Sequence, residues 1–146
     1  RDALIRFIDK SVASLEVKGD ALEKAETLVA IGDAMAIIGY RGGDFGIRYL
    51  ETWLRGDDKL KGPQTKGFLR ELRLSAAIAL GLSGNPKGRQ VLMKLRDNPG
   101  EDGSDKDLMK RIYDSLDDSV QIEKHGIDRY FNDGGSGQGQ NGKQRK

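Results

Sequence analysis

The feature that most constrains the fold is an internal similarity between two segments that lie 42 residues apart. At this offset glycines, alanines and large apolar residues of the chain coincide. The coinciding pairs are Ala34 and Ala76, Ile38 and Leu80, Gly39 and Gly81, Gly42 and Gly84, Gly46 and Gly88, Leu50 and Leu92, and Trp53 and Leu95. Each copy reads as an Ala-rich helix, a glycine turn and a second helix with its apolar residues in the same phase. This repeat predicts stacked helix pairs.

Composition agrees with a helical protein. The chain has 146 residues, enough for one domain, with 36% hydrophobic and 33% charged residues and a single tryptophan. Such a chain suits thin amphipathic helices better than a thick sheet core. We therefore expect an all-α fold.

Apolar residues three and four positions apart predict helices over 3–17, from Asp20 to about Ile38, from Asp44 to Gly56 and over 66–82. A further helix starts at Asn85-Pro86 and stops before Pro99. Ser104 or Asp105 caps a helix that carries Leu108, Ile112, Tyr113 and Leu116, and a short last helix covers 119–125. Residues 56–65 and 98–105 have the composition of loops.

Helix ends carry recognisable signals. Asp20 and Glu23 have the spacing of a capping box, and Asn85 before Pro86 is a strong start. Asp44 is the expected N-cap of the helix that follows Gly43. We assign the turns between helices to four glycines, Gly39, Gly42, Gly81 and Gly84, and expect a positive φ at Gly39 or Gly42.

The C-terminal end differs in composition. We expect Gly126 to end the last helix and Ile127, Tyr130 and Phe131 to fold back over an exposed end. Residues 133–146, DGGSGQGQNGKQRK, have no apolar side chain to offset the entropy lost on ordering. We predict a folded domain over 1–132 and a disordered tail over 133–146.

A family resemblance follows from these patterns. SAAIALGLSGNPKGRQVLMKLRD (75–97) resembles a HEAT repeat of the short bacterial type, in which an Ala-rich helix ends in Leu-Gly, a short turn ends in Asn-Pro and a Leu-rich helix follows. Residues 33–57 resemble the same unit, with Gly43-Asp44 in place of the polar-Pro pair. The resemblance implies a short α-solenoid of two to three antiparallel helix pairs. Its units would cover approximately 20–57, 66–98 and 105–131, with helix 2–17 as an N-terminal cap.

Several motifs resemble catalytic or ligand-binding motifs, but structural roles explain them better. DFG (44–46) lacks the other kinase elements, and RGG (41–43) is one copy inside a predicted folded unit. The chain has no cysteine and one histidine, His125, which we place in a last helical turn. The acidic residues Glu101, Asp102, Asp105 and Asp107 lack the ligand pattern of a calcium loop. We therefore predict no catalytic residue, no cofactor and no metal site.

Trp53 has two interpretations. An aromatic residue on a concave surface contacts bases in some DNA glycosylases of HEAT-like fold, which the resemblance makes relevant. The register of Trp53 with Leu95 in the repeat instead predicts that the indole is buried in the core.

The basic stretch is the strongest surface feature, because residues 55–96 carry a net charge of +7. The candidate partner-contacting or phosphate-contacting residues are Arg48, Arg55, Arg70, Arg73, Arg89 and Arg96. Such a ridge could bind phosphates. Asp57, Asp58 and Glu71 interrupt it, which favours a solvated surface.

We expect a non-enzymatic HEAT-like scaffold that binds another protein. The alternatives are nucleic-acid binding through 48–96, with the basic tail, and an enzyme of the bilin-lyase kind, whose members carry similar short units. No run of residues is long and apolar enough to span a membrane, so we expect no insertion. The lack of an apolar signal stretch slightly favours the cytoplasm, although a chain that starts at Arg1 leaves a removed targeting segment open. The partner and the oligomeric state stay open.

Overall fold

The computed structural model describes residues 2–15, 20–56 and 68–126, and these parts contain helices and no strand. The all-α prediction is confirmed. The helices are α1 (Asp2–Ser14), α2 (Ala21–Arg41), α3 (Gly43–Arg55), α5 (Leu69–Leu82), α6 (Pro86–Asp97), the 3₁₀ helix η2 (Gly100–Ser104) and α7 (Lys106–His125).

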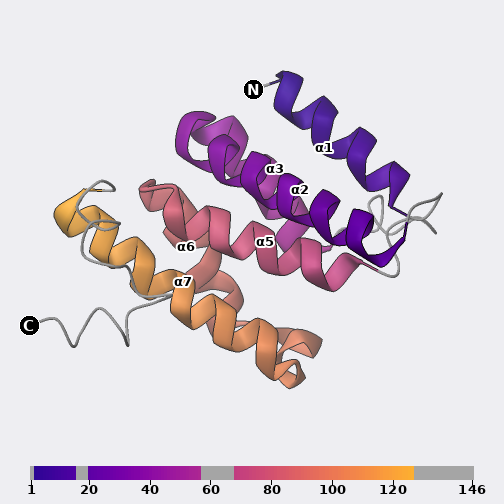
Figure 1. Ribbon diagram of the computed structural model, residues 1–146. Coiled ribbons are helices and arrows are strands. Elements are labelled where there is room, and N and C mark those ends of the chain that lie inside the picture. The colour runs from indigo at the N-terminus through magenta and orange to yellow at the C-terminus, as the bar shows by residue number, and fades with distance from the viewer. Residues whose placement is uncertain (1, 16–19, 57–67, 127–146) are drawn as a thin grey trace, which may run out of the picture.

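The helices form two layers (Figure 1). Helices α1, α2, α5 and α7 lie side by side in chain order, and we call them the front layer. Helices α3 and α6 lie behind them and form the back layer. Helix α3 packs on α2 and α5, and α6 packs on α5 and α7. Helix α5 therefore contacts both helices of the back layer.

One core fills the space between the layers. Its largest fully buried side chains come from every helix of the front layer and from both helices of the back layer: Ile8, Leu15, Ile31, Met35, Ile38, Leu50, Trp53, Leu54, Leu72, Leu80, Leu92 and Leu108. Trp53 is only 2% exposed, so the predicted burial of the indole is confirmed. At the N-terminal end, the Tyr49 hydroxyl donates to Asp9 Oδ1 over 3.1 Å and ties α3 to α1.

Side-chain caps fix three of the helix starts as predicted. The Glu23 N–H donates to Asp20 Oδ1 and the Asp20 N–H donates to Glu23 Oε1, each over 2.9 Å. Asn85 Oδ1 accepts from the Lys87 N–H over 2.9 Å, and Asp105 Oδ1 accepts from the Leu108 N–H over 3.1 Å. These contacts satisfy amide groups that have no partner within the helix.

Two of the glycines assigned to turns lie inside helices instead. Helix α2 continues to Arg41 and α5 to Leu82, so Gly39 and Gly81 are helical. Gly42 has a φ of −83°, and the positive φ of this corner occurs at Gly43, at 61°. The expected positive φ at Gly39 or Gly42 is therefore wrong. Gly84 has a φ of 68° and forms the turn as predicted.

Close contact between helices explains the two helical glycines. A Cβ on Gly39 would lie 2.7 Å from the carbonyl oxygen of Ala79 in α5. A Cβ on Gly81 would lie 2.5 Å from the carbonyl oxygen of Ser115 in α7. Real Cβ atoms essentially never approach an oxygen so closely, so only glycine fits without movement of the backbone. The two aligned glycines thus close two successive interfaces of the front layer.

The aligned pair Gly46 and Gly88 allows close contact between the layers. A Cβ on Gly46 of α3 would lie 2.5 Å from Ile38 O in α2, and one on Gly88 of α6 would lie 2.9 Å from Leu80 O in α5. The two carbonyl oxygens, of Ile38 and Leu80, belong to residues 42 positions apart, as do the two glycines. Helices α2 and α3 therefore meet in the same way as α5 and α6.

Asp44 is not the N-cap of α3. The cap residue is Gly42, which makes no side-chain hydrogen bond, and Asp44 lies in the first turn. Its carboxylate accepts from Lys87 Nζ over 2.7 Å instead. Helix α3 begins directly after the glycine corner, which places the aspartate inside the helix, where it faces a lysine of α6.

Helix α7 runs unbroken from Lys106 to His125, so the predicted separate helix over 119–125 is wrong. Its buried face includes Leu116, Ser119 and Ile122, which carry the inward-facing side of the helix across the expected break. Asp118 and Ser119, at the expected break, are buried. Gly126 follows the helix at a φ of 82° and ends it as predicted.

Three large apolar side chains of α2, α3 and α7 are exposed. Leu22 is 66%, Phe45 41% and Tyr113 54% accessible to solvent. All three lie away from the buried residues of their helices, although the sequence grouped Tyr113 with Leu108, Ile112 and Leu116, which are buried.

Several predictions fall on undescribed parts of the chain. The tail over 133–146, the folding back of Ile127, Tyr130 and Phe131, and most of the loop over 56–65 lie outside the described residues. Among the described helices, none is long and apolar enough to cross a membrane.

Candidate functional site

The arginines predicted to contact a partner are mostly engaged inside the molecule. Five of the six are paired with carboxylates: Arg55 with Glu51, Arg70 with Asp105 and Asp107, Arg73 with Asp102, Arg89 with Glu123, and Arg96 with Asp97. They lie on α3, α5 and α6. The structure therefore does not bring them together as one unpaired basic ridge.

Arg73 makes the most buried of these contacts, with 14% of its side chain exposed. Its guanidinium donates to both carboxylate oxygens of Asp102, at 3.0 and 2.7 Å, and through Nε to the Leu54 carbonyl oxygen at 2.7 Å. Arg73 of α5 thereby connects α5 to the end of α3 and to η2. Its role here is structural.

Arg70 holds the start of α7 in a similar way. It donates to Asp105 Oδ1 over 2.8 Å and to Asp107 Oδ2 over 2.9 Å. The hydrogen bond from Arg70, and then the one from the Leu108 backbone N–H, lowers the pKa of Asp105 to about 2. The acidic cluster is thus used for helix capping and ion pairing, as the sequence indicated for Asp105.

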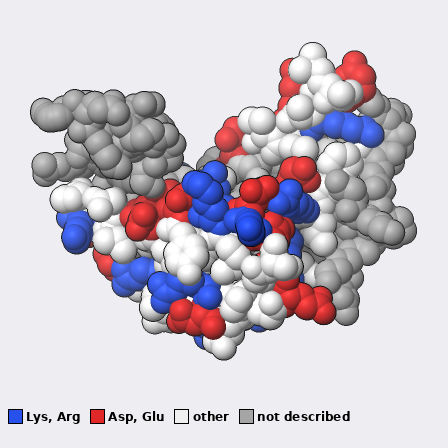
Figure 2. Space-filling model, turned by 90° about the horizontal axis from the view of Figure 1, so that it is seen from below, with Lys and Arg blue, Asp and Glu red and all other residues white. Residues whose placement is uncertain are grey.

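Figure 2 shows how the charges are distributed on one face of the molecule. Lysine and arginine side chains lie among aspartate and glutamate side chains, and neither sign forms an uninterrupted patch. A surface of this kind creates little long-range attraction for a polyanion.

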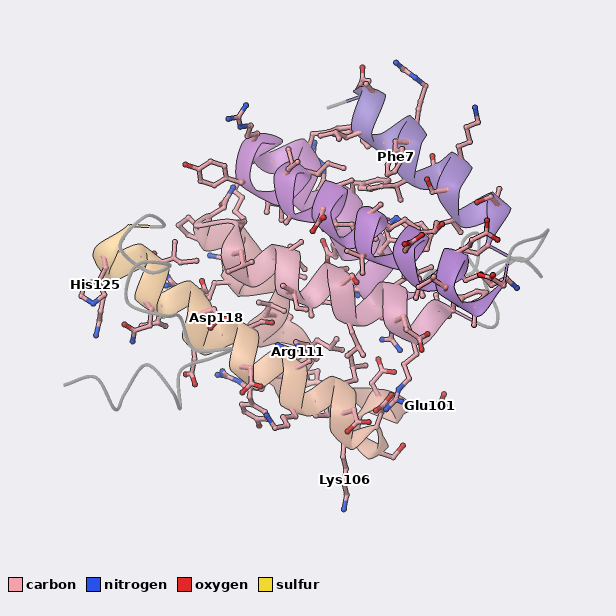
Figure 3. All side chains as sticks on the ribbon, viewed as in Figure 1. Phe7, Glu101, Lys106, Arg111, Asp118 and His125 are labelled. Atoms are coloured by element: carbon pink, nitrogen blue, oxygen red, sulfur yellow. The ribbon has the colours of Figure 1, made fainter. Side chains whose placement is uncertain are left out.

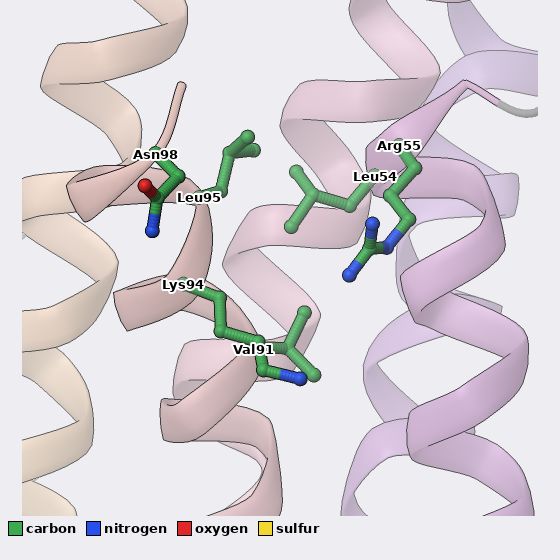
Figure 4. A pocket seen from close by; sticks show the side chains of 6 residues that line it. All are labelled: Leu54, Arg55, Val91, Lys94, Leu95 and Asn98. Carbon is green, nitrogen blue, oxygen red and sulfur yellow. The ribbon is translucent and has the colours of Figure 1, made fainter. Parts of the chain in front are cut away.

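A groove lies between α3 and α6 (Figure 4). One hollow of about 280 Å³ is lined by Leu54, Arg55, Val91, Lys94, Leu95 and Asn98. A second hollow of about 180 Å³ is lined by Asp44, Ile47, Arg48, Glu51, Lys87, Gln90, Val91 and Lys94. Val91 and Lys94 line both hollows, so these form one groove along the back layer. We call it the α3–α6 groove.

Helical geometry accounts for the lining residues. Those from α3 and those from α6 each recur three or four positions apart, and therefore lie on the side of each helix that faces the other. Figure 4 shows the side chains of Arg55 and Lys94 reaching into the space between the helices. Leu54 is fully buried, and Val91 and Leu95 are partly exposed at the bottom of the groove.

Two ion pairs mark the groove. Lys87 Nζ lies 2.7 Å from Asp44 Oδ2 and joins α6 to α3. This hydrogen bond and the lysine charge lower the pKa of Asp44 below its ordinary value. Arg55 pairs with Glu51 within α3 at 2.7 Å. Arg48 and Lys94 are exposed and have no ion-pair partner among the described residues.

His125 is the last residue of α7, in the final turn where the sequence placed it, and it is exposed (Figure 3). In the described ranges no three His, Asp or Glu side chains are grouped so that they could hold a metal ion. That the chain is not an enzyme stays a prediction.

Sequence reasoning missed the groove, although two of its lining residues, Arg48 and Arg55, were among the predicted contact residues. A signal was present, because charged and apolar residues alternate at helical spacing on the same side of both helices of the repeat. Such a mixed face differs from the fully apolar stripe of a packed interface.

Comparisons with protein-family models, curated proteins and solved structures gave no match. The resemblance to HEAT repeats accordingly rests on the sequence pattern.

Proposed function

We propose that the chain is a non-enzymatic helical-repeat scaffold of the HEAT-like kind that binds another protein. The observation that carries the proposal is the equivalence of the two helix pairs. Gly39 and Gly81 make matching contacts with the next front-layer helix, and Gly46 and Gly88 make matching contacts within the pairs. A helix pair repeated in sequence and in contacts is the unit of an α-solenoid.

In this proposal α2–α3 and α5–α6 are the two units, and α7 packs on the second as the next front-layer helix. Helix α1 packs on the first unit and takes the place of the predicted N-terminal cap. The outward sides of α1 and α7 carry mainly polar residues, as expected for helices at the ends of a stack. The remainder of the predicted third unit, beyond Gly126, lies outside the described residues.

Protein binding is the function that this arrangement supports best. Solenoids use surfaces formed by successive units to hold polypeptides, and the α3–α6 groove lies where the second helices of two units meet. The internal ion pairs of five arginines speak against the predicted phosphate-binding ridge. The scaffold role is inferred by analogy with other helical-repeat folds, and the groove offers a surface on which a partner could bind.

The test is affinity capture with the immobilised chain, followed by binding of each purified candidate to the purified chain. We expect at least one protein that binds directly, saturably and after nuclease treatment. Turnover of a small molecule without any direct protein partner would contradict the proposal. So would salt-sensitive binding of oligonucleotides at micromolar protein in a fluorescence anisotropy assay, if no protein bound.

A further inference from the structure

We infer that the α3–α6 groove binds a short acidic segment with apolar side chains, supplied by a partner protein. This inference rests on the proposed scaffold function and specifies its binding site and the chemistry of its ligand. It follows from three properties of the groove: its floor, its charge and its length.

The floor of the groove is apolar. Val91 and Leu95 of α6 are partly exposed there and lie near the buried Leu54 of α3. Apolar side chains of a ligand would cover these carbon atoms and remove them from water, which stabilises a complex in proportion to the area covered. A ligand that fits this floor needs apolar groups of its own.

The rim of the groove is positively charged. Its lining includes Arg48, Arg55, Lys87 and Lys94 but only two carboxylates, those of Asp44 and Glu51. Both carboxylates are already paired, with Lys87 and Arg55 respectively. Arg48 and Lys94 are left without an ion-pair partner among the described residues, one on each side of the groove. They would complement carboxylates of a ligand.

The length of the groove suits a peptide. Its lining extends from Asp44 to Arg55 on α3 and from Lys87 to Asn98 on α6, which corresponds to about 16 Å at the rise of an α-helix. This accommodates about three turns of a helical ligand or about five residues of an extended one.

A nucleic acid fits the groove less well than an acidic peptide does. Its phosphates would complement the same cations, but none of the lining residues is aromatic, so the bases would have no stacking partner. The apolar floor would also face a sugar–phosphate backbone instead of alkyl groups.

The experiment measures fluorescence anisotropy with three labelled probes. The first is a 12-residue peptide with Leu at positions 1, 4, 5 and 8 and Glu at most others. The second has Lys in place of Glu, and the third is a 12-nucleotide single strand. The protein variants are R48E/K94E and, as the matched control, K106E, which reverses an exposed charge at the start of α7 outside the groove lining. Circular dichroism verifies that each variant folds.

We expect saturable binding of the Glu peptide and at least about tenfold weaker binding by R48E/K94E, because each reversal replaces an attraction with a repulsion. The K106E variant should bind as the unmodified chain does. Affinity for the Glu peptide should also fall as salt is raised.

Equal affinity of R48E/K94E and the unmodified chain for the Glu peptide would overturn the inference, as would tighter binding of the Lys peptide or the oligonucleotide. Self-association that R48E/K94E abolishes, without peptide binding, would assign the groove to a second copy and overturn it too. If a captured partner binds R48E/K94E unchanged, the groove inference fails while the scaffold function stands.

Discussion

In the front layer the backbones of neighbouring helices come so close at Gly39 and Gly81 that no Cβ fits, whereas in the back layer α3 and α6 face each other across a groove lined by long charged side chains. Backbone contact fixes both the spacing and the residue type. Where side chains only partly fill the gap between two helices, neither the helix spacing nor the residue type is fixed. The difference makes the spacing of the front-layer helices intolerant of added atoms and leaves the space between α3 and α6 available for a ligand.

The largest expected effect is that of Gly81→Ala. The new methyl group would lie 2.5 Å from Ser115 O and force α5 and α7 apart. Overpacking of this kind costs about 1–3 kcal/mol of unfolding free energy. Gly39→Ala should act in the same direction at the α2–α5 interface, where the distance is 2.7 Å. Urea denaturation followed by circular dichroism measures both.

Gly32→Ala is the matched control. It is also a helical glycine of α2 that faces α5, but its Cβ would lie 3.5 Å from Ser75 Oγ, an ordinary contact. Because alanine favours the helix, this substitution should stabilise the protein by about 0.5–1 kcal/mol. The groove variant R48E/K94E should leave the urea midpoint nearly unchanged. If Gly81→Ala were as stable as Gly32→Ala, the contrast between the layers would not hold.

An effect of comparable or smaller size is expected where the layers are tied together. Arg73→Ala removes the donor to Leu54 O and the bidentate partner of Asp102. Loss of partners for polar groups in a largely shielded place should lower the free energy of unfolding by about 1–3 kcal/mol. Arg73→Lys should recover only part of this, since one amine cannot replace the guanidinium fork.

Arg96→Ala is the comparison for Arg73→Ala, and urea denaturation again supplies the measurement. Among the described residues the ion-pair partner of Arg96 is its neighbour Asp97, so removal of Arg96 should change stability less than removal of Arg73. A larger effect for Arg96 would show that the contacts of Arg73 contribute little.

The smallest effect concerns the start of α7 and depends on pH. The folded-state pKa of Asp105 is about 2, below the ordinary value of 3.8. The ionised carboxylate therefore stabilises the folded state fully above about pH 4, and this contribution is lost as pH falls towards 2. Asp105→Asn retains a capping side chain but removes the charge. Its difference in stability from the unmodified chain should shrink between pH 5 and pH 2.

Asp33→Asn provides the control for that pH series. Asp33 is exposed on α2, and its substitution should leave the acid dependence of thermal unfolding close to that of the unmodified chain. If Asp105→Asn and the unmodified chain lost stability in parallel between pH 5 and pH 2, the ion pair with Arg70 would not act as the structure indicates.

Local signals in the sequence predicted much of this fold. Asp20, Asn85 and Asp105 act on amides two or three residues away, and such contacts can be recognised from spacing alone. The 42-residue offset likewise identified the helix pairs. Glycine is more ambiguous, since the same residue permits a turn at Gly84 and a close helix contact at Gly81.

Contacts distant in sequence were less accessible. Nothing near Asp44 indicates that Lys87, 43 residues later, will take its carboxylate, and nothing near Arg70 indicates Asp105. The partners of charged side chains are decided by how the helices pack. The mixed charged and apolar faces of α3 and α6 were readable from the sequence, but the groove between them was not, because it depends on the separation of the two helices.

The burial of Trp53 has a practical consequence. It is the only tryptophan of the chain, and it lies in the core of the first helix pair at 2% exposure. Selective excitation of the indole therefore gives an optical signal from a single known position, without any added label. Its emission would follow the opening of α3 from α2 and α5 during unfolding, while circular dichroism records all helices together. A lag between the two signals would reveal whether the two helix pairs come apart in one step or in succession.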